Sequence, residues 1–210
     1  MNIQIKCHHC QQVQDFEIYP EINVSKEPAL KNMVLNFELF KDTCQNCHQI
    51  IPVSYGTIYH DFDQRFLVLL DPNHSKSLTE INKNLLTEYG ELDNYMIRVV
   101  SNPDDLKEKI LLRDAHLDDR LIEIVKQYYV ASALEKNPKL ELSTVLFSRG
   151  ITTHEIVFIT TDQQKFKADL NEEVMNHLKT LYRQKIEEFT QKGANRIDAH
   201  WVSVLFESRH

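Results

Sequence analysis

Alternation of apolar and polar residues over the first 70 positions predicts a series of short β-strands. A turn carrying two closely spaced cysteines separates the first two strands. A short helix is expected over residues 25–36, with Ser25 as its N-cap and Pro28 in its first turn. The strands are expected at residues 2–6, 13–19, 37–43, 49–60 and 65–70, as one small antiparallel sheet.

The later part of the chain changes between helical and strand periodicity. Its longest helix is expected to begin with a capping box formed by Asp169 and Glu172. The helices are expected at residues 78–89, from Pro103 onward, from Asp118 to Lys136, and from Asp169 to Gly193. The strands are expected at residues 95–100, in a three-stranded meander over residues 141–168, and at residues 199–207 as a last strand of the same sheet.

The helix from Asp118 to Lys136 has one apolar and one polar face. Its apolar stripe is formed by Leu121, Ile122, Val125, Tyr128 and Tyr129. Glu123, Lys126 and Gln127 fall on the opposite face, and we expect them to be exposed to solvent.

All four cysteines of the chain, Cys7, Cys10, Cys44 and Cys47, fall in two Cys-x-x-Cys pairs that are separated by 33 residues. A two-residue spacing lets a tight turn direct both sulfurs at one ion, and zinc accepts a tetrahedron of four thiolates. In a reducing compartment such pairs favour metal ligation over disulfides. The spacing therefore predicts one structural zinc ion, and a redox dithiol is the alternative.

These patterns together predict an α+β protein with two parts. Residues 1–75 are expected to form a zinc-ribbon-like module of antiparallel strands. Residues 76–210 are expected to form a second module, in which helices cover a mixed or antiparallel sheet.

The net charge of −7 argues against a general attraction to nucleic acid or to anionic membranes. Residues 1–52 are also negatively charged, because their four Lys and six Asp or Glu residues give a net charge of −2. The longest apolar run, residues 66–70, is far shorter than the roughly 20 residues that span a bilayer, and no secretory signal is expected. We therefore expect a cytoplasmic protein that does not enter membranes.

A second group of side chains could in principle form a metal or acid/base site. His60 and Asp61, together with His116, Asp118 and Asp119, offer nitrogen and oxygen ligands if the fold brings them together. The other interpretation is structural: Asp118 and Asp119 suit the positive end of a helix, and His60 and Asp61 end a strand.

Beyond the cysteines, several short segments look like those of a known family: Ser25–Pro28, Leu39-Phe40, Tyr59–Asp61, Arg98–Val100, Glu108–Ile110, Leu117–Arg120, Ile122-Glu123 and Lys126. Through these segments the chain resembles the CpXC family, bacterial proteins with paired Cys-Pro-x-Cys motifs. The resemblance covers about residues 1–126 and implies a zinc site at the cysteine pairs, but it implies no reaction. His8 and Gln45 stand where the family has proline, and Gln11 and His48 stand where glycine is common after the second cysteine of a pair.

A zinc-stabilised protein-interaction or regulatory module, with another protein as its partner, is the function that these features favour. An enzyme that uses His60, Asp61 and Asp118 is the first alternative. A nucleic-acid-binding zinc ribbon is the second, although acidic residues separate the lysines of the N-terminal part. The pattern leaves the oligomeric state open.

Overall fold

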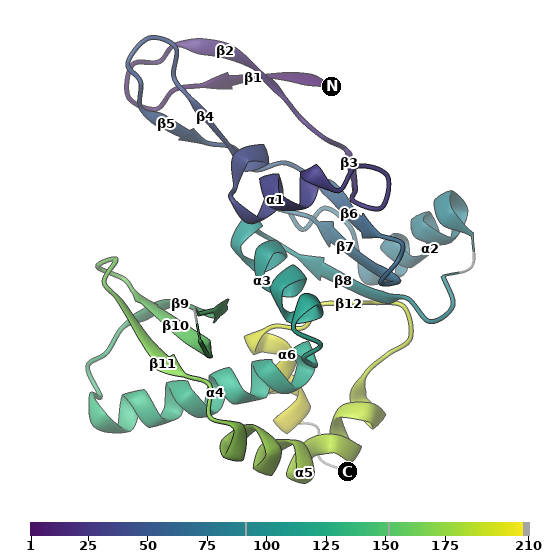
Figure 1. Cartoon of the computed structure of the whole chain (residues 1–210), viewed down its shortest axis with the longest axis vertical. Coiled ribbons are helices and arrows are strands. Elements are labelled where there is room, and N and C mark those ends of the chain that lie inside the picture. The colour runs from purple at the N-terminus through teal and green to yellow at the C-terminus, as the bar shows by residue number, and fades with distance from the viewer. Residues whose placement is uncertain (91, 151, 208–210) are drawn as a thin grey trace. The chain divides into compact units, whose positions relative to one another are not determined.

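The computed structural model describes residues 1–90, 92–150 and 152–207. Contacts divide the chain into two compact units (Figure 1). The first unit contains Met1–Lys107 and Gly193–Asn195, and the second contains Glu108–Lys192 and the residues from Arg196 onward. Both units contain helices and β-sheet, which confirms the predicted α+β class.

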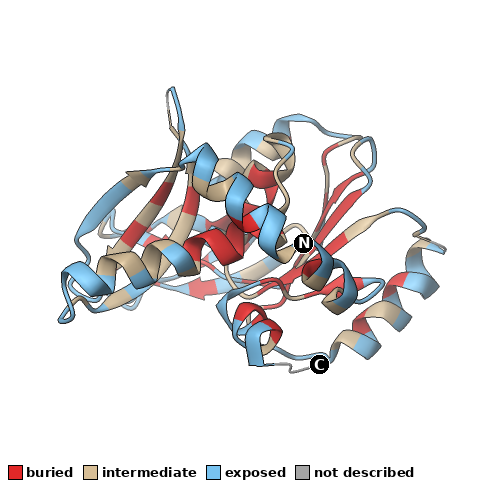
Figure 2. Cartoon of the chain, turned by 90° about the horizontal axis from the view of Figure 1, so that it is seen from below, coloured by how far each residue is buried: buried red, intermediate tan, exposed pale blue. Residues whose placement is uncertain are grey.

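A five-stranded mixed sheet forms the centre of the first unit. Its strands lie in the order β12-β8-β7-β6-β3, where β6 and β7 are antiparallel and the other neighbours are parallel. The central strand β7 has the continuous apolar sequence of a strand that is covered on both faces, and most of its residues are buried (Figure 2). The strands are β3 (Glu21–Asn23), β6 (Thr57–Asp61), β7 (Phe66–Leu70), β8 (Met96–Val100) and β12 (Ala194–Asn195).

The cysteine pairs lie on two separate hairpins of the first unit. Strands β1 (Asn2–Lys6) and β2 (Val13–Glu17) form one hairpin, and β4 (Lys41–Thr43) and β5 (Ile50–Pro52) form the other. Figure 1 shows the two hairpins close together at one end of this unit. The prediction of one sheet around both pairs was therefore wrong, because β6 and β7 belong to the five-stranded sheet.

The helices of the first unit are α1 (Ala29–Leu35), the short 3-10 helix η1 (Glu38–Phe40) and α2 (Leu78–Tyr89). Helix α2 has the predicted bounds, because Ser77 and Glu80 form a capping box and Gly90 ends the helix with a positive φ of 73°. The predicted cap of α1 was wrong. The Ser25 hydroxyl instead accepts hydrogen bonds from the backbone amides of Phe62 and Asp63, which follow β6.

The second unit consists of helices and a three-stranded antiparallel meander. Its elements are α4 (Asp119–Lys136), β9 (Leu142–Arg149), β10 (His154–Thr160), β11 (Lys165–Asp169), α5 (Glu172–Phe189) and α6 (Ala199–Glu207). Helix α3 (Pro103–Asp114) begins in the first unit and ends in the second. The meander and the bounds of α4 agree with the prediction.

Two sequence predictions for the second unit were wrong. Residues 199–207 form helix α6 rather than a strand, because the buried residues Trp201, Val202 and Leu205 share one helical face that packs in the core with α4. Asp198 accepts a hydrogen bond from the Trp201 amide at 2.8 Å and so begins this helix. The cap of α5 is Asn171, not the predicted Asp169.

The predicted boundary at residue 75 falls between β7 and β8, which are paired in one sheet. Residues 194–195 return to this sheet beside β8, where the Asn82 side chain accepts a hydrogen bond from the Ala194 amide at 2.8 Å. The division of the chain into modules of residues 1–75 and 76–210 stays a prediction.

Candidate metal centre

The first cysteine pair lies in the turn of the β1–β2 hairpin. The Cys7 amide donates to the Gln12 carbonyl at 2.8 Å, and the Gln11 amide donates back to the Cys7 carbonyl at 3.0 Å. Gln11 follows Cys10 and has a left-handed φ of 62°. This conformation usually favours glycine, and here a glutamine adopts it.

The second pair repeats this turn in the β4–β5 hairpin. The Cys44 amide donates to the Gln49 carbonyl at 2.9 Å, and the His48 amide donates to the Cys44 carbonyl at 3.0 Å. His48 follows Cys47 with a φ of 59°. The two turns thus present their sulfurs through the same backbone geometry, without the glycine or proline expected from the family pattern.

The four sulfurs converge on one point. Their Sγ atoms all lie within 4.8 Å of one another. Across the hairpins, the Cys7 and Cys47 sulfurs are 3.6 Å apart and the Cys10 and Cys44 sulfurs are 3.5 Å apart. A tetrahedron with metal–sulfur bonds of about 2.3 Å has edges of about 3.8 Å, so these separations fit a four-thiolate metal site. They are too long for disulfides, and all four cysteines are free.

Hydrogen bonds, burial and the neighbouring sulfurs all affect the ionisation of the four thiols. A side-chain hydrogen bond from Asn46 is the main cause that lowers the pKa of Cys10 to about 6. A backbone hydrogen bond from Gln49 acts to lower the pKa of Cys47, but burial and the neighbouring sulfurs raise it to about 12. Four thiolates at these distances repel one another, so a cation is needed to hold them all deprotonated.

Gln14 joins the two hairpins beside the sulfurs. Its side-chain amide donates to the Asp42 carboxylate at 2.6 Å and to the Thr43 carbonyl at 3.1 Å, and its oxygen accepts from the Gln45 amide at 3.0 Å. Gln14 is buried although it lies in a short exposed hairpin. Gln14 was not among the residues predicted for the site. The signal for it was a polar side chain at a position of β2 that alternates with exposed ones and is buried.

His60 and Asp61 lie at the end of β6 and have local structural partners. The His60 Nε2 atom is 3.3 Å from the Tyr95 hydroxyl, and its Nδ1 atom is 3.8 Å from the Glu21 carboxylate. The Asp61 carboxylate accepts hydrogen bonds from the backbone and the side chain of Gln64 at 3.0 and 3.2 Å. Asp61 therefore stabilises the turn between β6 and β7.

Asp118 and Asp119, the other two aspartates of the predicted second site, belong to the second unit. Asp118 is the N-cap of α4 and accepts from the Arg120 amide at 3.0 Å, and Asp119 forms an ion pair with Lys109 at 3.2 Å. His116 is exposed and has a φ of 54°. Within the described ranges, the group of metal-ligating side chains that lies close enough to hold an ion is that of the four cysteines.

A buried group of five charged residues joins α3 and α4 within the second unit. The Lys126 amino group lies 2.9 Å from Glu108 and 2.8 Å from Glu123, and the Lys109 amino group donates to the Ile197 carbonyl at 2.8 Å. The expected exposure of Glu123 and Lys126 was therefore wrong, because they are only 3% and 6% exposed. The group consists of Glu108, Lys109, Asp119, Glu123 and Lys126.

Burial raises the pKa of Glu108 to about 7, although Lys126 offsets part of the effect. The unfolded chain releases this proton near its ordinary value of 4.5, whereas the folded protein retains it to higher pH. We therefore expect the stability of the protein to fall as pH rises from about 4.5 to about 7. Glu108→Gln should flatten this fall in denaturant unfolding measured across the same range, because glutamine cannot ionise.

Glu135→Gln is the matched control for this pH series. Glu135 is an exposed residue of α4 without a partner in the described part of the chain. Glu135→Gln should show the same dependence of stability on pH as the wild type. If Glu108→Gln also showed the wild-type dependence, the role assigned to Glu108 would be contradicted.

The fold and the sulfur cluster define an α+β protein with a candidate metal centre built on two hairpins. The model of the CpXC family, described as CpXC protein, matches residues 5–126. This match covers more than half of the chain, so the chain belongs to the CpXC family, as the sequence resemblance predicted. It includes all four cysteines and the five buried charged residues. Searches of curated proteins and of solved structures find no match to this chain.

Proposed function

We propose that Cys7, Cys10, Cys44 and Cys47 bind one zinc ion with a structural role. The convergence of the four sulfurs carries this proposal. Four thiolates in a tetrahedron suit zinc, and four protein ligands leave no coordination position for a reacting water. The ion would therefore hold the two hairpins together and give the N-terminal part its zinc-ribbon character.

Elemental analysis of gently purified, tag-free protein tests the metal. We expect about one zinc per chain, and Co²⁺ substitution should give the intense visible absorption of a tetrahedral thiolate site. A negligible zinc content, or stoichiometric iron instead, would refute the proposal.

We propose further that the protein is a cytoplasmic binding or regulatory module whose partner is another protein. Val13 and Ile50 support this proposal, because each is the third residue after the second cysteine of its pair. Val13 is 45% exposed and Ile50 is 67% exposed. Exposed apolar residues at equivalent positions of two rigid turns provide contact area for a protein surface. In the described ranges, none of the helices combines the length and apolarity needed to cross a membrane.

Affinity purification from the native cell compares the wild type with Val13→Ser/Ile50→Ser. A reproducible protein partner should be retained by the wild type and lost by this variant, while the zinc content of both stays the same. Leu86→Ser/Leu181→Ser is the matched control, because it removes two exposed leucines outside the hairpins. Recovery of nucleic acid alone, of no partner, or of the same partner with all three proteins would overturn the proposal.

A further inference from the structure

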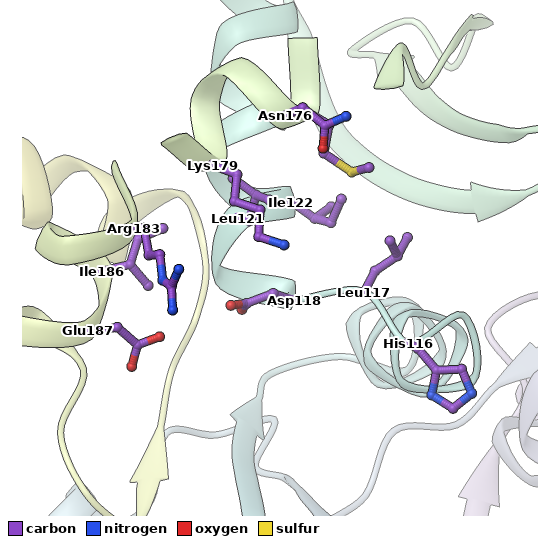
Figure 3. A pocket seen from close by; sticks show the side chains of 11 residues that line it. His116, Leu117, Asp118, Leu121, Ile122, Asn176, Lys179, Arg183, Ile186 and Glu187 are labelled. Carbon is purple, nitrogen blue, oxygen red and sulfur yellow. The ribbon is translucent and has the colours of Figure 1, made fainter. Parts of the chain in front are cut away.

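A pocket of about 360 Å³ lies in the second unit, between the beginning of α4 and helix α5 (Figure 3). This volume falls within the range of small-molecule sites. The buried side chains of Leu121, Ile122 and Ile186 contribute its apolar lining. The pocket therefore offers an apolar surface to the body of a small ligand.

Two cations on α5 line the same pocket. Lys179 and Arg183 are one helical turn apart, and Figure 3 shows their charged groups directed toward the space that Asp118 borders. Both side chains are exposed, and neither has a hydrogen bond or ion pair with any residue in the described ranges. Their charges are thus available to a ligand.

The acidic residues of the pocket already have a partner. Arg120 binds the Asp118 carboxylate through two nitrogens, at 2.9 and 2.8 Å, and lies 3.0 Å from the Glu187 carboxylate. Arg120 does not line the pocket itself, but it adds a third cation to Lys179 and Arg183, so these Lys, Arg, Asp and Glu side chains sum to +1. One negative charge on a ligand balances this sum, whereas a doubly charged phosphate would leave an excess of negative charge beside the two carboxylates.

We propose that this pocket binds a small monocarboxylate with an apolar body. The planar guanidinium of Arg183 suits a carboxylate, with Lys179 as a second donor, and Leu121, Ile122 and Ile186 cover the apolar part. This site is separate from the cysteine cluster and does not depend on the proposed zinc or protein partner.

Titration with hexanoate and with benzoate, followed by amide NMR shifts of the full chain, tests the proposal. We expect saturable shifts concentrated at residues 116–122 and 175–187. Lys179→Ala/Arg183→Ala should weaken the binding about tenfold or more, because it removes charge-assisted hydrogen bonds. Arg149→Ala/Lys165→Ala is the matched control, since it deletes one exposed Arg and one exposed Lys of the meander and should bind as the wild type does.

Two further probes test the charge and the body of the ligand. Hexan-1-ol has the apolar body without the charge, and hexyl phosphate has a second charge, so both should bind more weakly than hexanoate. The proposal is overturned if neither carboxylate gives saturable shifts up to about 10 mM, or if either of these probes binds as tightly as hexanoate. Equal binding by Lys179→Ala/Arg183→Ala and its control would also overturn it.

Discussion

Cys44→Ser is expected to abolish zinc binding and to unfold the β1–β2 and β4–β5 hairpins. Two-stranded hairpins are marginal by themselves in water. Structural zinc contributes roughly 10–16 kcal/mol of apparent free energy near neutral pH, which matches the stability of a whole domain. The hairpin amides should therefore lose protection in hydrogen exchange, while the amides of α4 and α5 in the second unit keep theirs. Chelation of the wild type should give the same pattern.

Gln45→Ser is the control for this experiment. Gln45 is adjacent to Cys44 in the same turn, and its side chain is exposed. This variant should retain one zinc and the hydrogen-exchange protection of the wild type. Metal-free wild type with fully protected amides in β1 and β4 would show that the hairpins need no ion, and the structural role would be abandoned.

Local spacing explains why the convergence of the four cysteines could be predicted from the sequence. Each Cys-x-x-Cys turn is closed by hydrogen bonds within six residues, such as that from the Cys7 amide to the Gln12 carbonyl. The α2 helix was predictable for the same reason, since its capping box and its terminal Gly90 are close in sequence. Features encoded by neighbouring residues are thus readable without knowledge of the tertiary fold.

Long-range pairing explains the errors. Residues 194–195 join β8 almost 100 positions away, and the two residues of β12 carry no strand signal of their own. In residues 199–207 the spacing of the apolar residues fits both a strand and a helix. The helix forms because only that conformation packs the apolar residues against the core that α4 contributes to. Glu123 and Lys126 were predicted to face solvent because helical periodicity cannot reveal their partners on another helix. Lys109 pairs with Glu123, and Glu108 pairs with Lys126.

Lys126→Met is expected to destabilise the second unit by about 3–5 kcal/mol, because it leaves the buried Glu108 carboxylate without its cation and Glu123 with Lys109 alone. Lys126 is 6% exposed and contacts both Glu108 and Glu123. Burial acts to lower the pKa of Lys126, but these two carboxylates more than offset it, so the pKa is raised and the amino group stays charged. Denaturant unfolding at neutral pH measures the loss.

Lys167→Met provides the comparison, since it breaks an ion pair of similar length, 2.7 Å, at a lysine that is 58% exposed. An exposed pair contributes only about 0–1 kcal/mol, so this variant should lose far less stability. Glu108→Gln/Lys126→Met should recover part of the loss, because it also removes the carboxylate that Lys126→Met leaves without a partner. Similar losses of unfolding free energy for Lys126→Met and Lys167→Met would mean that the buried charges stabilise the protein no more than a surface pair does. The expected difference would show that the charges between α3 and α4 help to hold the second unit together.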